Sequence, residues 1–331
     1  MKNLIQKLVE IHSPSGYEGA IREAIRAEIS SLVDEVRVDA LGNLIARKGT
    51  AGSQGKKIML SAHMDEIGLI ATHVDENGFV RFTTLGGVRA RNLPGGRVRF
   101  VNGVPGVIGK QYRSEDGSSA MEELFIDVGA RDRKSCPLRV GEVAAFDRTF
   151  ADLGERLVAK AMDDRIGVAV LIETLRGLGT SPHELYFVFS VQEEVGLRGA
   201  TTAAYGIDPD IGLAVDVTGT GDTPKDSFMD VSLGKGPAIK VRDGGMLTDP
   251  RVVKWMEQTA IQLRLPYQLE VLEGGTTDAR AIQLSRAGVP VGCLSIPCRY
   301  IHSPSEMVDY SDVQNAVRLM VELLGAPVDL G

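Results

Sequence analysis

The segment KIMLSAHMDE, residues 57–66, decides how this chain folds. Its apolar run, residues 58–62, is typical of a strand that is buried on both faces, as in a parallel sheet covered by helices. The run ends at His63, whose imidazole can bind a metal or move a proton. An apolar strand followed by a polar cluster recurs several times further along the chain.

Helical and strand patterns alternate on both sides of this segment. Apolar residues at helical spacing predict helices at 3–12, 18–33, 166–178, 251–263 and 278–286, with a last helix opening at Ser311. The stretch EVRVDALGNLIARKG predicts two strands around a glycine turn, and ELYFVFSV, IGLAVD and VPVGCLSI predict buried strands. This alternation predicts an α/β fold with a mostly parallel sheet flanked by helices.

Residues 72–157 have a different texture. Their segments are short, β-rich and interrupted by Gly, Asn-Gly and Pro, which is typical of a small barrel or sandwich. The block lies between His63 and Asp163, two candidate site residues. We therefore expect it to be inserted into a catalytic α/β domain made of residues 1–71 and 158–331.

Composition excludes several classes of function. The net charge is −7 and Lys and Arg do not cluster, so we expect no nucleic-acid partner. The N-terminus lacks the apolar core of a signal peptide, and no apolar run approaches the ~20 residues that span a bilayer. We expect a cytoplasmic protein with no membrane partner. Because the three cysteines form no CxxC pair, a metal site would have to use His and carboxylates.

Five polar clusters stand at or near the ends of predicted elements. They are SAHMDE (61–66), KAMDDR (160–165), SVQEEVG (190–196), AVDVTGT (214–220) and RYIHSPSE (299–306). Ligands of open α/β sheets bind beyond the carboxyl ends of the strands. We therefore expect these clusters to converge on one site.

The residue types in these clusters suit a pair of metal ions. Two histidines and several carboxylates without a thiolate are ligands for Zn²⁺, Co²⁺ or Mn²⁺. Two ions about 3.5–4 Å apart need a bridging carboxylate, which either Asp163 or Asp164 could supply. The pair Glu193–Glu194 offers one ligand and one free general base if the chain turns there, as Gly196 favours.

Each cluster alone also has an ordinary structural explanation. His63 could be a hydrogen-bonded surface residue, Asp163–Asp164 a helix N-cap and Glu193–Glu194 a solvated turn. The remaining histidines stand in contexts without a partner, so we expect His12 and His183 at the surface and His73 in a structural role. The coincidence of five clusters favours a functional site.

The motifs HMDEIG (63–68), KAMDDR, EEVGLRGA (193–200), AVDVT (214–218) and RYIHSPSE, in this order, resemble those of the M42 family of metallo-aminopeptidases over essentially the whole chain. The resemblance implies that His63 and Asp216 bind one metal, that Asp163 bridges, and that Glu194 and His302 bind the other. It further implies that Glu193 is the general base and that Asp65 orients His63. The implied ions are Zn²⁺ or Co²⁺. The inserted block is then a small β-barrel or PDZ-like dimerisation domain, and the dimers assemble into a dodecamer.

The implied reaction removes N-terminal residues from short peptides with a metal-activated water. Three alternatives stay open: a deacylase or carboxypeptidase of the same clan, a glucanase, and a non-catalytic peptide-binding assembly. Residues 273–282, EGGTTDARAI, resemble a family stretch beside the substrate pocket, although Thr277 and Arg280 depart from the expected pattern. Arg280 would either bias the pocket towards acidic side chains or face solvent, and Asp278 would otherwise serve as a helix N-cap.

Overall fold

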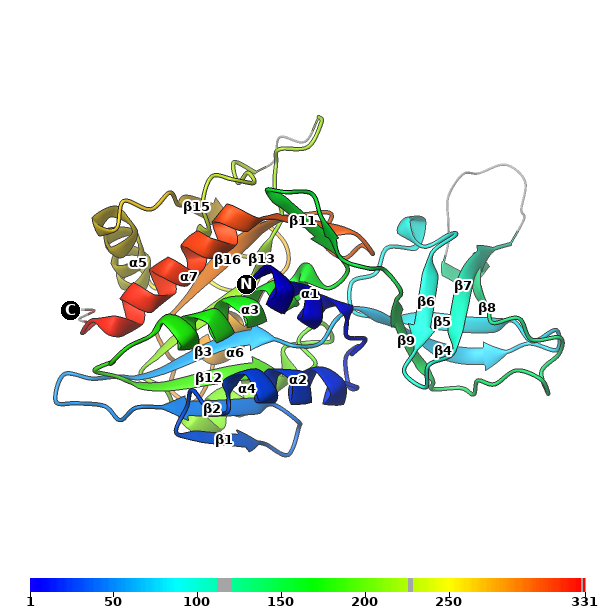
Figure 1. The fold of residues 1–331 in the computed structure, drawn as a ribbon, viewed down its shortest axis with the longest axis horizontal. Coiled ribbons are helices and arrows are strands. Elements are labelled where there is room, and N and C mark those ends of the chain that lie inside the picture. The colour runs from blue at the N-terminus through cyan, green and yellow to red at the C-terminus, as the bar shows by residue number, and fades with distance from the viewer. Residues whose placement is uncertain (112–120, 226–228, 329, 331) are drawn as a thin grey trace.

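The computed structural model describes residues 1–111, 121–225, 229–328 and 330. These residues form an α/β body with a β-barrel lying to one side of it (Figure 1). Within the described part of the chain, no helix has the length and apolar character that crossing a membrane would require.

Four parallel strands form the centre of the large sheet. In spatial order they are β12 (Glu184–Ser190), β3 (Lys57–His63), β13 (Ile211–Thr218) and β16 (Val291–Arg299). Their residues are almost all buried, because helices cover both faces of the sheet. The expectation of a doubly buried strand at residues 58–62 is confirmed.

The outer strands of this sheet are antiparallel. They are β1 (Glu35–Val38) and β2 (Leu44–Lys48) on one side, and β17 (Glu306–Asp309), β11 (Arg156–Ala159) and β10 (Ala151–Asp152) on the other. Off this path, β14 (Ala238–Arg242) pairs antiparallel with β16 and parallel with β15 (Gln268–Val271). The α/β class is confirmed, but the sheet is mixed, because its central strands are parallel and its outer strands pair antiparallel.

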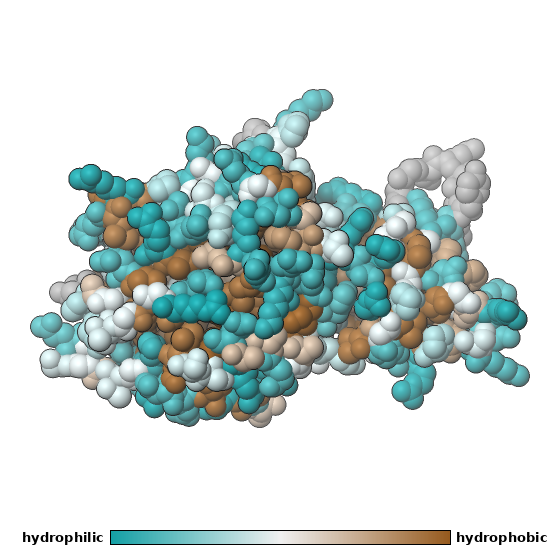
Figure 2. Space-filling view, viewed as in Figure 1, coloured by the Kyte–Doolittle hydropathy of each residue, from teal (hydrophilic) through white to brown (hydrophobic). Residues whose placement is uncertain are grey.

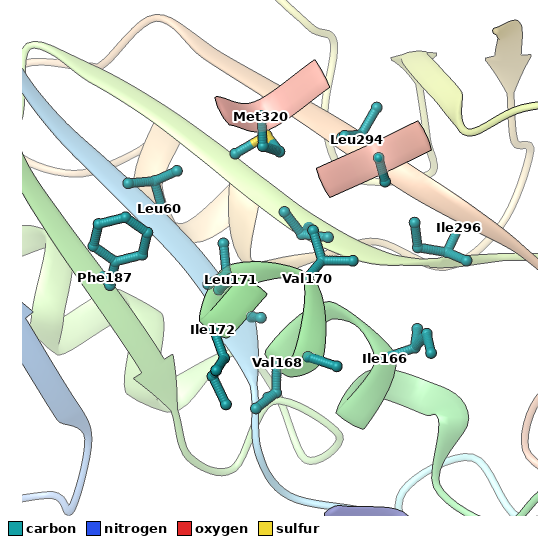
Figure 3. Close-up of a cluster of buried hydrophobic side chains, with 14 of the residues drawn as sticks. Leu60, Ile166, Val168, Val170, Leu171, Ile172, Phe187, Leu294, Ile296 and Met320 are labelled. Carbon is teal, nitrogen blue, oxygen red and sulfur yellow. The ribbon is translucent and has the colours of Figure 1, made fainter. Parts of the chain in front are cut away.

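Helices cover both faces of the sheet. The helices α1 (Lys2–Glu10), α2 (Gly19–Ile29), α3 (Met162–Gly177), α5 (Pro250–Gln262) and α7 (Tyr310–Gly325) share one apolar core, and α4 (Arg198–Ile207) and α6 (Asp278–Gln283) pack in another. Helix α3 is buried on nearly every side because the sheet, α1, α2 and α7 all pack around it. Figure 3 shows its Val170 in one cluster with Leu294 of the sheet and Met320 of α7.

The inserted block forms a closed six-stranded barrel with its own core. Its strands are β4 (Gly68–Val74), β5 (Val80–Leu85), β6 (Arg97–Phe100), β7 (Pro105–Lys110), β8 (Leu124–Asp127) and β9 (Val143–Phe146), with 3-10 turns at Ala90–Asn92 and Met121–Glu123. Closure leaves no free sheet edge. Our division at residues 72 and 157 stays a proposal, although the barrel strands themselves run from Gly68 to Phe146 and β10 and β11 lie in the large sheet.

The face of the molecule in Figure 2 is mainly hydrophilic. Apolar residues appear there as separate small groups on both the body and the barrel. Scattered apolar residues of this kind are normal on a protein surface.

Candidate metal centre

The polar clusters converge at the carboxyl ends of the central parallel strands. His63 is the last residue of β3, Asp163 lies at the start of α3 and His302 follows β16. The Nε2 atom of His63 is 2.9 Å from Oδ1 of Asp163, and the Nε2 atom of His302 is 3.3 Å from Oδ2 of the same carboxylate. One carboxylate therefore lies between two imidazoles.

The chain turns at Glu193–Glu194, so both carboxylates reach this site. The carbonyl oxygen of Glu193 accepts the main-chain N–H groups of Gly196 and Leu197, which folds the segment back after β12. Glu194 Oε2 is 3.1 Å from Nε2 of His302, and Glu193 Oε2 is 3.9 Å from Nε2 of His63. The two neighbouring acids thus face different imidazoles.

Asp216 joins the site from β13. Potential ligand atoms of His63, Asp164 and Asp216 all lie within 4.8 Å of one another, as do those of His63, Asp163 and Glu194. Asp164 was not in the ligand set that the resemblance implies. Its carboxylate accepts the main-chain N–H of Gly167 at 3.0 Å and that of His63 at 3.2 Å, so it fixes the backbone that carries His63.

Asp65 connects His63 to the pair of glutamates. Nδ1 of His63 lies 3.2 Å from the carbonyl oxygen of Asp65 and 3.5 Å from its Oδ1. The buried Asp65 carboxylate also accepts the main-chain N–H groups of Glu193 and Glu194 and the hydroxyl of Ser15. Such outer contacts fix the orientation of a ligating imidazole. Ser15 carried no signal in the sequence, because its neighbours look like an ordinary loop.

Glu306 is a second supporting acid that the sequence reasoning missed. Its side chain is buried, with Oε2 accepting the N–H of Asp163 at 3.0 Å and Oε1 accepting the N–H of His302 at 2.8 Å. It ends the motif RYIHSPSE, so the signal was present. The motif alone could not show that this carboxylate points at the start of α3.

Burial and crowding perturb the acids and bases of the site. Burial and the charges of Asp216 and Glu194 raise the pKa of Glu193 well above its usual value. Burial and the Asp163 charge do the same for Asp216. Although burial opposes the charge, hydrogen bonds to Asp163 and Glu194 raise the pKa of His302 to about 11. The carboxylates therefore strongly favour a positive charge between them.

The residues fit divalent metal binding. The donors are imidazole nitrogens and carboxylate oxygens, the ligands that Zn²⁺ and Co²⁺ accept. Within the described residues, Glu194 Oε1 is buried and has no hydrogen-bond partner. Burying a carboxylate oxygen without a partner costs free energy of folding. Cations would satisfy this oxygen and relieve the repulsion among the acids.

A cavity of about 970 Å³ opens onto these residues. Leu272, Leu284, Tyr205 and Arg280 line it away from the metal centre. Arg280 is exposed. Asp278 is not the N-cap of α6, because Thr277 caps that helix. Instead, Asp278 is buried and accepts hydrogen bonds from the hydroxyls of Ser61 at 2.6 Å and Ser190 at 2.5 Å.

The other histidines lie outside the site. His12 is partly exposed, with Nε2 3.7 Å from Asp147, and His73 is exposed on β4. The expectation that His183 lies at the surface is wrong, because it is fully buried. Its Nδ1 accepts the N–H of Lys56 at 3.0 Å and its Nε2 donates to the carbonyl oxygen of Ala326 at 2.9 Å. Two segments distant in sequence close over it.

Comparison with known proteins identifies the family. The sequence model of the family described as M42 glutamyl aminopeptidase matches residues 42–319. The chain belongs to the M42 peptidase family. It is therefore a peptidase, and the resemblance noted in the motifs is confirmed.

Relatives and solved structures match this M42 peptidase along nearly its full length. A protein of Acetivibrio thermocellus with a provisional aminopeptidase name is 47% identical over 98% of both chains. The solved structure of the aminopeptidase APDkam598 from Desulfurococcus kamchatkensis has a TM-score of 0.94 and 42% identity over 98% of this chain and 94% of that one. The TET1 peptidase of Pyrococcus horikoshii, whose structure is described as a tetrahedron or a large octahedral shell, has a TM-score of 0.88 and 33% identity over 98% of both.

Proposed function

We propose that this M42 peptidase is a two-metal aminopeptidase that removes N-terminal residues from short peptides. The observation that carries the proposal is the Asp163 carboxylate, whose two oxygens face Nε2 of His63 and Nε2 of His302. In the proposed ligand set, His63 and Asp216 hold one ion, Glu194 and His302 hold the other, and Asp163 bridges. Zn²⁺ and Co²⁺ suit this donor set.

When bound, the ions would lower the pKa of a water and polarise the peptide carbonyl. Glu193 takes the proton from the attacking water and passes it to the leaving amine. A raised pKa suits this task, because a carboxylate with a higher pKa is a better proton acceptor. The Asp65 carboxylate accepts the Glu193 N–H at 3.0 Å, which holds the main chain of the base beside His63.

The surroundings favour a free N-terminus. The acids of the site would attract the α-ammonium group of a peptide, whereas an N-acetylated peptide lacks that charge. The cavity of about 970 Å³ suits a side chain and a short stretch of peptide, not a folded protein. These features support an exopeptidase acting on short substrates.

The test is turnover of a series of aminoacyl-p-nitroanilides by protein loaded with Zn²⁺ or Co²⁺, each beside its N-acetylated form. Cleavage of the free amines alone, abolished by a chelator, is the expected result. Release of acetate from the acetylated forms, with the anilide bond intact, would indicate a deacylase, and release of C-terminal residues from peptides would indicate a carboxypeptidase. Cleavage of glucans would indicate a glucanase, and peptide binding without turnover a non-catalytic assembly. Any of these four results would overturn the assignment as an aminopeptidase.

We also propose that the chain self-associates into dimers through the barrel and that the dimers form a dodecamer. The likeness to the TET1 peptidase, which assembles into large shells, supports this proposal. Light scattering coupled to size-exclusion chromatography would test it, and a monomer at all concentrations would contradict it. The expected cytoplasmic location stays a prediction.

A further inference from the structure

Two consecutive glycines of the barrel lie against the metal centre. Gly86 and Gly87 follow β5, on a loop of the barrel. A Cβ atom on Gly87 would lie 2.7 Å from Cε1 of His302 and closer still to Nδ1. A Cβ atom on Gly86 would lie 2.9 Å from Oε2 of Glu194. The barrel main chain therefore leaves no room for a side chain beside two of the proposed ligands of one ion.

The two glycines are needed for different reasons. Gly86 has a φ of +81°, a left-handed conformation that favours glycine whatever surrounds it. Gly87 does not have a left-handed φ, so its φ alone does not require glycine. What excludes a side chain at Gly87 is the His302 ring itself. A substitution of Gly87 therefore tests the contact with the His302 imidazole, whereas a substitution of Gly86 would also strain the main chain.

The two imidazoles of the site are held in different ways. Nδ1 of His63 faces the carbonyl oxygen of Asp65 at 3.2 Å, the usual kind of contact that fixes a ligating ring. Within the described residues, Nδ1 of His302 makes no hydrogen bond. The main chain of His302 is fixed by Glu306, but its ring is also partly exposed and has Gly87 beside Nδ1.

We propose that Gly87 is a positioning residue that seats the His302 imidazole against Asp163 and Glu194. The main chain of the barrel takes the place that a hydrogen-bonding partner has beside His63. The barrel thereby helps to hold the ion assigned to His302 and Glu194. This inference rests on the proposed function, because it assumes that His302 is a ligand.

The test compares Gly87→Ala with the wild type by titrating Zn²⁺ into metal-free protein, with metal content measured after dialysis. A methyl group at this position must displace the ring or the loop. We expect one of the two ions to bind roughly 10- to 100-fold more weakly, the usual effect of losing a contact that orients a ligand. The other ion keeps its affinity, and excess metal restores turnover. Unchanged affinity for both ions would overturn the inference.

Gly179→Ala is the matched control, since Gly179 has no left-handed φ and a Cβ there would meet open space. His302→Ala separates this inference from the proposed function: if that variant still binds two ions tightly, the ligand set is wrong. A metal-free melting temperature shows whether Gly87→Ala folds. If it is destabilised, the double variant decides, because Gly87→Ala should weaken metal binding no further once His302 is absent. An equal further loss in that background would overturn the role of Gly87.

Discussion

The carboxylate of Glu306 accepts the main-chain N–H of Asp163 at 3.0 Å. The same carboxylate accepts the N–H of His302, so one buried acid fixes the backbones of the proposed bridging ligand and of a terminal ligand. Both of its oxygens are used by these main-chain N–H groups. The chain thus carries acids of two kinds in this region, those proposed to bind metal and those that hold the ligands in place.

Glu306→Gln should weaken metal binding although it removes no ligand. The amide group can accept only one of the two N–H groups, and its NH₂ would oppose the other. We expect a loss of metal affinity of roughly 10- to 100-fold and a stability loss of about 1–3 kcal/mol. Calorimetric titration and urea unfolding measure the two effects. The exposed Glu322→Gln on α7 is the control, and wild-type affinity in Glu306→Gln would show that this acid does not position the ligands.

Glu193→Gln should keep both ions and lose most of its turnover. The amide cannot accept the proton of the attacking water, and a general base contributes about 10²- to 10⁴-fold to a rate. Metal content by mass spectrometry and kcat on a leucyl anilide test the two halves of the prediction. The exposed Glu23→Gln should match the wild type. Full turnover in Glu193→Gln would remove this residue from the mechanism.

His183 should make the fold sensitive to mild acid. Burial lowers the pKa of folded His183 from 6.5, so the unfolded chain binds a proton first as the pH falls. The stabilisation from the neutral ring is therefore complete above about pH 6.5 and is lost as the pH falls through the folded pKa. Protonation would place an N–H on Nδ1 against the N–H of Lys56.

Urea unfolding of wild-type and His183→Gln protein between about pH 5.5 and 8 would test this titration. The stability advantage of the wild type should shrink as the pH falls. His73→Gln, at an exposed histidine, is the control variant. A constant difference between the wild type and His183→Gln across this range would show that His183 does not titrate as expected.

Arg280 should favour acidic N-terminal residues. Its side chain lines the cavity, and within the described residues its guanidinium has no hydrogen bond or ion pair. Arg280→Gln should lower kcat/KM for a glutamyl anilide roughly 10-fold, because hydrogen bonds to charged groups are strong. The kcat/KM for a leucyl anilide should stay unchanged. Arg286→Gln is the control within the same cavity, since that guanidinium already donates to the carbonyl oxygen of Tyr205. An unchanged ratio of kcat/KM between the glutamyl and leucyl anilides would show that Arg280 does not select acidic N-terminal residues.

The sequence was most informative where strands end. His63, Glu193 and Asp216 each stand at the carboxyl end of an apolar strand, and a parallel sheet brings such ends together. The barrel could be predicted from its short β-rich segments. Both predictions rest on patterns that are local in sequence.

Contacts between distant segments were the part that the sequence could not supply. Ser15 reaches Asp65 from another segment, Gly87 reaches His302 from the barrel, and the burial of His183 depends on the carbonyl of Ala326. Of the antiparallel outer strands, only the pair β1–β2 was predicted, as two strands around a glycine turn, because apolar runs do not encode the direction of the others. In each case the deciding partner lies far along the chain, where no periodicity points to it.

The barrel separates β3 from α3 in sequence, and His302, the last proposed ligand, stands 239 positions (302 − 63) after His63, the first. A ribosome must therefore translate nearly the whole body and the barrel before the fifth ligand emerges. Nascent chains that stall earlier hold an incomplete set of donors. With the proposed ligand set, the pair His302 and Glu194 is completed only when synthesis of the chain is nearly finished.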